Sequence, residues 1–234
     1  MRIVSMLFVL VSLCVFPFPT KATEISSRTA VCKEGAERYV LFTPARPGPA
    51  AAVVLLHGAG GQPEPMVEAW KTLARKENIV LIAPVLPRVA AFEAIAPAIF
   101  RCVVEDAKQV AAIDARRVYL FGHSMGGYLA YDGALLESQY FAAAAVHAMG
   151  IDKDYEGIVG RAQRKIPLAI YVGEQDQLVS LDDVRRTQKL LKKAGFDVHY
   201  VEMAHHDHDY FAVADEVNAD AWRFMKGFQL PAGE

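Results

Sequence analysis

The chain has 234 residues, a length that suits one domain or two small ones. Hydrophobic residues make up 53% and charged residues 22%, which is the balance of a globular chain with a sizeable core and excludes a disordered one. The formal net charge is −2 and no run of Lys or Arg stands out, so no binding to nucleic acid or to an anionic membrane is expected.

Residues 1–22 have the three-part layout of a secretory signal peptide. Arg2 supplies a positive charge, residues 3–16 are almost wholly apolar, and residues 20–22 offer small side chains before a cut after Ala22. A membrane anchor is the alternative, but the apolar run is shorter than the roughly 20 residues of a spanning helix. We therefore expect export to the periplasm or the medium, with residues 23–234 as the mature domain and no stable membrane anchor.

Two cysteines, Cys32 and Cys102, remain after the predicted cleavage. An even pair in an exported protein indicates either a disulfide or two buried thiols. The sequence leaves both open, because it does not show whether the two Cα atoms approach each other.

Short apolar runs alternate with helical patterns along the mature chain. Strands are expected at residues 38–42, 51–56, 79–83, 117–121, 141–146, 168–172 and 198–203. Helices are expected at residues 66–78, within 90–113, and at 124–136, 181–194 and 215–226, with 154–164 helical or looped. This alternation predicts an α/β fold with a mainly parallel sheet covered by helices on both faces. No stretch is long enough for a lid domain, so we expect a site covered only by loops such as 86–96 and 150–164.

The strongest chemical motif is Gly122-His123-Ser124-Met125-Gly126, between a predicted strand and a predicted helix. An abrupt strand-to-helix turn makes the serine oxygen project from the sheet edge, and it requires small residues two before and two after the serine. The alternative is an ordinary helix N-cap serine. The context favours Ser124 as a nucleophile.

A glycine-rich segment, Leu55-Leu56-His57-Gly58-Ala59-Gly60-Gly61, follows the buried strand 51–56. Acyl transfer develops an oxyanion that needs preorganised N–H donors. We assign these donors to the backbone N–H groups of Ala59 and Met125, and expect His57 to shape the loop. A phosphate-binding loop is the weaker alternative, because the segment lacks the required Lys-Ser/Thr and the G-x-G-x-x-G spacing.

The third element of a catalytic triad is a carboxylate that orients the histidine. Asp176 follows the strand 168–172 in a turn, and it is our choice for this role. Glu174 nearby and Asp152 and Asp154 after the preceding strand are the competitors.

Three histidines follow the last predicted strand, in Ala204-His205-His206-Asp207-His208-Asp209-Tyr210. The chain order Ser, Asp, His resembles that of α/β-hydrolases. We choose His208 as the base, with His206 as second choice and His205 last. The cluster is also rich enough to suggest zinc, but its spacing is not that of a standard metal site, so no metal or other cofactor is expected.

With these elements in order, residues 39–230 resemble the α/β-hydrolase superfamily, and within it single-domain esterases similar to dienelactone hydrolases, feruloyl esterases and polyhydroxybutyrate depolymerases. Gly173-x-x-Asp176-x-x-Val179 resembles their acid loop, and His208-Asp209 the His-Asp of some esterases. The resemblance implies an eight-stranded sheet and ester hydrolysis through an acyl-enzyme. The chain departs from dienelactone hydrolases, which usually carry a cysteine nucleophile, and it lacks the Gly-Gly-His often found at the base.

The sequence therefore predicts a serine carboxylic-ester hydrolase acting on a small-molecule or polymeric ester. A serine peptidase on the same fold and a non-catalytic exported binding protein on a hydrolase scaffold are the alternatives.

Overall fold

The computed structural model describes residues 24–87 and 96–232. The predicted signal peptide and most of the expected loop 86–96 lie outside the described residues. Within the described part, no helix is both long and apolar enough to cross a membrane.

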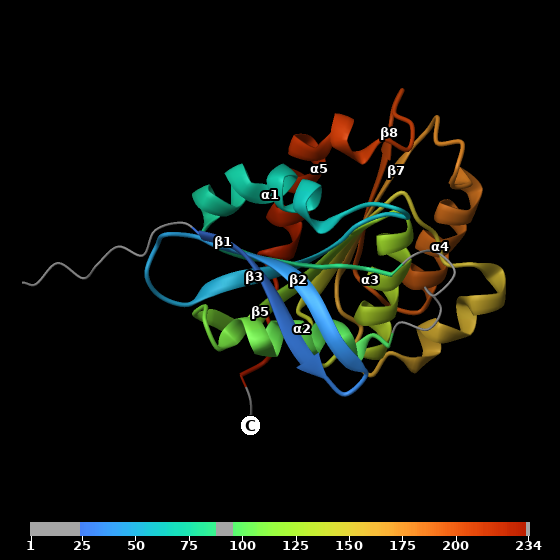
Figure 1. Cartoon of the computed structure of the whole chain (residues 1–234). Coiled ribbons are helices and arrows are strands. Elements are labelled where there is room, and N and C mark those ends of the chain that lie inside the picture. The colour runs from blue at the N-terminus through green and yellow to red at the C-terminus, as the bar shows by residue number, and fades with distance from the viewer. Residues whose placement is uncertain (1–23, 88–95, 233–234) are drawn as a thin grey trace, which may run out of the picture.

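The described strands form one eight-stranded sheet (Figure 1). In sheet order they are β1 (Glu24–Cys32), β2 (Gly35–Thr43), β4 (Ile79–Pro84), β3 (Ala50–Leu56), β5 (Ile113–His123), β6 (Ala143–His147), β7 (Leu168–Gly173) and β8 (Val198–Met203). From β4 to β8 every neighbouring pair is parallel, whereas β1 and β2 are antiparallel at one edge. The carboxyl ends of the parallel strands therefore meet at one edge of the sheet, where loops from different parts of the chain come together.

Helices cover both faces of this sheet, as predicted (Figure 1). On one face lie α1 (Pro63–Glu77) and α5 (Ala214–Met225), and on the other lie α2 (Ala98–Lys108), α3 (Met125–Leu136) and α4 (Leu181–Lys193). Two short 3-10 segments, η2 (Lys153–Arg161) and η3 (Tyr210–Ala212), lie in the connections after β6 and β8. All seven residues of β3 are buried, which explains its continuous apolar sequence.

β1 is a strand that the hydrophobic pattern did not reveal. Its sequence Glu-Ile-Ser-Ser-Arg-Thr-Ala-Val-Cys contains few apolar residues, and Val31 is 89% exposed. It forms because it pairs along its whole length with β2, from Glu24 opposite Thr43 to Cys32 opposite Gly35. The count of seven strands read from the pattern is therefore one too low, while the eight strands implied by the family resemblance are present.

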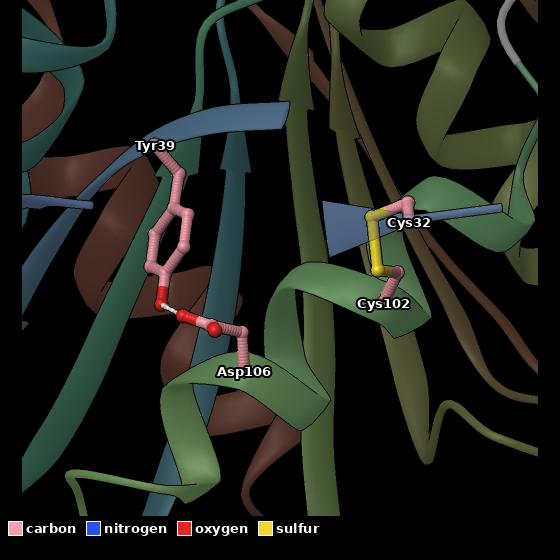
Figure 2. Close-up of a disulfide and its surroundings, with 4 residues drawn as sticks. All are labelled: Cys32, Tyr39, Cys102 and Asp106. Atoms are coloured by element: carbon pink, nitrogen blue, oxygen red, sulfur yellow. Dashed lines mark hydrogen bonds between the residues drawn. A yellow bond between two sulfur atoms is a disulfide. The ribbon is translucent and has the colours of Figure 1, made fainter. Parts of the chain in front are cut away.

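A disulfide joins Cys32 at the end of β1 to Cys102 in α2, with the two Cα atoms 5.9 Å apart (Figure 2). Beside it, the Tyr39 hydroxyl donates a 2.6 Å hydrogen bond to Asp106 of α2 (Figure 2). Arg28 Nε donates to the same carboxylate oxygen at 3.1 Å. The edge hairpin is thus fastened to α2 by one covalent bond and one polar cluster. Of the two alternatives that the sequence left open for Cys32 and Cys102, the structure shows the disulfide.

Candidate active site

Ser124 lies at the turn between β5 and α3, with φ 53° and ψ −123°. A positive φ in a non-glycine residue costs of order 1–3 kcal/mol, and such strain gathers at functional sites. The turn is tight because three backbones meet there. A Cβ at Gly122 would lie 2.1 Å from the Gly126 carbonyl oxygen, and one at Gly126 would lie 2.1 Å from that of Leu56. Only glycine fits at these two positions.

A hydrogen-bonded chain links Ser124 to the loops after β7 and β8. His208 Nε2 lies 2.9 Å from Ser124 Oγ, and His208 Nδ1 lies 2.7 Å from Asp176 Oδ2. The Asp176 carboxylate is fully buried, and its other oxygen accepts the backbone N–H groups of Leu178 and Val179, each at 2.9 Å. These two donors fix the carboxylate so that one oxygen faces the imidazole, which holds the proton on Nδ1 and leaves Nε2 to accept from the serine.

The loops that carry Asp176 and His208 approach each other closely at Gly173, the last residue of β7. A Cβ there would lie 2.2 Å from the His206 carbonyl oxygen, and that same oxygen accepts a 2.9 Å hydrogen bond from the Gln175 N–H. Asp176 and His208 are thus brought together by main-chain contacts between two loops, and not only by their own hydrogen bond.

The alternative site residues lie elsewhere. His206 is 7% exposed and turns its Nε2 toward His147 Nε2, at 3.3 Å, while His205 is exposed. Glu174 is also exposed. Asp152 and Asp154 line a separate cavity, beside α3 and η2. The structure therefore joins Ser124, Asp176 and His208, and none of their competitors.

Two further histidines, His123 and His147, adjoin the hydrogen-bonded chain, and neither is among the site residues predicted from the sequence. Their Nδ1 atoms lie 3.0 Å apart, and the His123 ring packs 5.0 Å from that of His208. Burial lowers the pKa of His147 to about 2 and that of His123 to about 4, so both rings are neutral near pH 7. Hydrogen bonds therefore run from His206 through His147 to His123, next to Ser124. Because they are neutral, His147 and His123 place no positive charge beside His208.

The loop after β3 lies directly against the serine. A Cβ at Gly58 would contact Ser124 Cβ at 3.4 Å. His57 holds this loop: its Nδ1 lies 2.8 Å from the Gly58 carbonyl oxygen, and its Nε2 accepts from the Leu86 N–H at 3.2 Å. Burial lowers the pKa of His57.

The backbone N–H groups of Ala59 and Met125 donate no hydrogen bond to any described residue. Met125 is the first residue of α3, where the N–H groups have no partner within the helix. Both groups are therefore available to an oxygen of a bound molecule.

The histidine-rich loop does not gather its side chains around one point. His206 contacts His147 and His208 contacts Ser124, while Asp207 and Asp209 each accept a backbone N–H of their own loop. Over residues 24–87 and 96–232, no group of three or more His, Cys, Asp or Glu side chains is arranged to hold a metal ion.

A mainly parallel eight-stranded sheet, with a serine on a strained turn after β5 and an acid and a histidine on the following loops, defines an α/β-hydrolase. The model of the dienelactone hydrolase family matches residues 38–229, and the chain belongs to this family. No curated protein matches the sequence.

Solved structures share the fold at low sequence identity. A thermostable esterase superposes with a TM-score of 0.71 at 20% identity, over 88% of this chain and 63% of that one, so the match spans less than two thirds of the length of that esterase. S-formylglutathione hydrolase from Staphylococcus aureus gives 0.73 at 16% identity, over 90% of this chain and 99% of that one. Acylaminoacyl peptidase from Pyrococcus horikoshii gives 0.70 at 13% identity, over 92% of this chain and 44% of that one.

Proposed function

We propose that this hydrolase cleaves carboxylic esters through an acyl-enzyme formed on Ser124. The observation that carries the proposal is the hydrogen-bonded chain from Asp176 through His208 to Ser124, at 2.7 and 2.9 Å. A histidine within hydrogen-bonding reach of a hydroxyl and oriented by a buried carboxylate is the arrangement that activates serine as a nucleophile.

In the acylation half, Ser124 Oγ attacks the ester carbonyl carbon while His208 Nε2 takes the hydroxyl proton. The negative charge that develops on the carbonyl oxygen is stabilised by the N–H groups of Ala59 and Met125. Asp176 stabilises the imidazolium. Collapse of the tetrahedral species breaks the bond to the alcohol, which leaves with the proton from His208 and with the acyl group on Ser124.

In the deacylation half, His208 takes a proton from water, and the hydroxide oxygen attacks the acyl carbon. The same two N–H groups stabilise the second oxyanion. Ser124 leaves with the proton returned by His208, so the free acid is released and the enzyme is regenerated. The strained backbone at Ser124 keeps its oxygen in place through both halves.

We also propose that the protein acts outside the cytoplasm, with residues 1–22 removed as a signal peptide. The disulfide between Cys32 and Cys102 supports this location, since disulfides persist in oxidising compartments and are rare in the cytosol. Amino-terminal sequencing of the exported protein tests the cut after Ala22.

The function is tested with p-nitrophenyl esters of increasing acyl length and with the matching p-nitroanilides. We expect ester hydrolysis by the wild type, and a fall of about three orders of magnitude or more in Ser124→Ala with its fold intact. Full esterase activity in Ser124→Ala would overturn the proposal. Faster cleavage of the anilides than of the esters would instead identify a peptidase.

A further inference from the structure

A cavity of about 680 Å³ lies beside α3, η2 and the start of α4. In Figure 1 the segment that contains η2 runs next to α3. Four carboxylates line this acidic cavity, together with the aromatic rings of Tyr128 and Tyr155. The carboxylates are those of Asp132, Asp152, Asp154 and Asp183.

The acidic cavity is close to the serine but distinct from it. Tyr128 and Asp132 are four residues apart in α3, so their side chains share one face of the helix. Asp132 comes eight residues after Ser124, which places it about 12 Å along the helix axis. A ligand in the cavity therefore sits beside the same helix that begins at the nucleophile, and does not occupy the position of the reacting carbonyl.

Asp132 is the unexplained group in this cavity. It is only 6% exposed, and its Oδ1 has no hydrogen-bond partner among the described residues. Burial raises its pKa to about 6, opposed by the Tyr155 hydroxyl and by Arg161. A buried carboxylate oxygen without a partner is costly to the fold. A cation bound in the cavity would supply the missing partner.

The cations already present are too few to neutralise the lining. The Arg186 guanidinium is occupied by ion pairs with Asp183 and Glu156. Asp132, Asp152 and Asp154 form no ion pair with a described residue, and the one other cation that lines the cavity, Lys153, is exposed. Beside these three carboxylates, the remaining positive charges are the exposed Lys153 and the nearby Arg161, which is not a lining residue of the cavity.

The aromatic pair fits the same kind of ligand. The Tyr128 and Tyr155 rings stack with centroids 5.4 Å apart and planes 25° from parallel. The negative face of an aromatic ring attracts organic cations, and quaternary ammonium ligands are recognised by such rings. A metal ion is a poorer fit, because the described residues place no group of three ligating side chains around one point.

We propose that the acidic cavity between α3, η2 and α4 binds the ammonium group of a small organic cation, with Asp132 as its buried counter-ion. The ammonium group is either the far end of an ester substrate or part of a free amine. The shared chemistry, a compact positive charge with apolar substituents, is the same in both cases.

The first experiment measures binding by isothermal titration calorimetry, using tetramethylammonium and tert-butanol, a neutral molecule of similar size. We expect the wild type to bind the cation and not the alcohol. Asp132→Asn, which keeps the side-chain shape and removes the charge, should weaken cation binding at least about tenfold. Asp197→Asn, an exposed residue outside the cavity, is the matched control and should bind as the wild type does.

The proposal is overturned if Asp132→Asn binds the cation as tightly as the wild type, if tert-butanol competes equally, or if the wild type binds no tetramethylammonium. Circular dichroism checks that each variant is folded. Should Asp132→Asn fail to fold, Asp152→Asn at the same cavity provides the test, with a smaller loss expected because its carboxylate is exposed.

A second experiment identifies the source of the cation and rests on the proposed function. Two p-nitrophenyl esters of equal chain length are compared, one ending in a trimethylammonium group and the other in a tert-butyl group. A rise of KM for the cationic ester alone in Asp132→Asn assigns the cavity to the substrate. An unchanged KM with lost tetramethylammonium binding assigns it to a free amine. If neither ester is hydrolysed, the proposed function fails while the calorimetric result stands.

Discussion

His208 Nε2 lies 2.9 Å from Ser124 Oγ, although the two residues are 84 positions apart in the chain. His206, two residues earlier, points its Nε2 at His147 instead. His205 takes a left-handed conformation with φ 60° at the turn after β8, and in the loop that follows His206 faces His147 while His208 reaches Ser124. The identity of the base thus depends on the path of a loop.

Replacing the two histidines one at a time tests this assignment. We expect His208→Ala to lower turnover of an activated ester by about three orders of magnitude, because no other imidazole of the described residues is hydrogen-bonded to Ser124 Oγ. His206→Gln, which keeps polar atoms at the position, should retain activity within about tenfold. Steady-state kinetics on both purified variants decides the point, and the reverse pattern would make His206 the base.

The glycines of the serine turn give a steric prediction. A Cβ at Gly126 would meet the Leu56 carbonyl oxygen at 2.1 Å, so Gly126→Ala forces β3 and α3 apart and should cost about 4 kcal/mol or prevent folding. A Cβ at Gly157 in η2 would meet nothing within 4 Å, and Gly157→Ala should change stability by less than about 1 kcal/mol. Urea denaturation of the pair measures the contrast, and equal effects would contradict the close approach.

The disulfide gives a stability prediction that is independent of catalysis. Cys32 and Cys102 close a loop with a sequence separation of 70, for which the chain-entropy model gives about 4 kcal/mol. The double variant Cys32→Ser/Cys102→Ser should lose a stabilisation of this order and become insensitive to reductant. Denaturation of both proteins with and without dithiothreitol tests this. A wild type that reductant leaves unchanged would argue against the bond.

Asp132 makes stability depend on pH in an unusual direction. Its ordinary pKa of 3.8 is raised to about 6 in the folded state, so between these values the folded chain binds the proton more tightly than the unfolded chain does. This contribution to stability is present below about pH 4 and is lost as the pH rises through 6. Over that window it amounts to about 3 kcal/mol.

Asp132→Asn should remove this pH dependence. Its free energy of unfolding, relative to the wild type, should rise by up to about 3 kcal/mol between pH 4 and pH 7. Comparing the two proteins at each pH cancels the other titrating groups, and Asp197→Asn is the control. A difference that does not vary with pH would mean that Asp132 does not titrate against folding.

Much of the fold follows from buried apolar runs. The strand expected at residues 198–203 is β8 to the residue, and the one expected at 51–56 is β3 with one residue more. β1 escaped because its polar sequence is held by pairing with β2 and by the bond at Cys32, neither of which leaves a periodic pattern.

In the candidate site, too, the features set by neighbouring residues could be predicted from the sequence, whereas the contacts between distant residues could not. Ser124 was recognisable because its glycine neighbours are dictated by the turn itself. The His123–His147 contact was not, because it depends on β5 and β6 being neighbours in register, with these two residues opposite each other. The contact could have been predicted by aligning the last residues of the two parallel strands, β5 and β6, because His123 and His147 stand at these ends. The acidic cavity likewise required the packing of η2 against α3.

The central claim is that Ser124 is a nucleophile activated by His208. Its most direct test is labelling with a fluorophosphonate, followed by mass spectrometry of the peptide that contains the serine turn. We predict one phosphonylated residue, Ser124, in the wild type, slow labelling in His208→Ala, and none in Ser124→Ala. Labelling of another residue, or equal labelling of Ser124→Ala, would contradict the account.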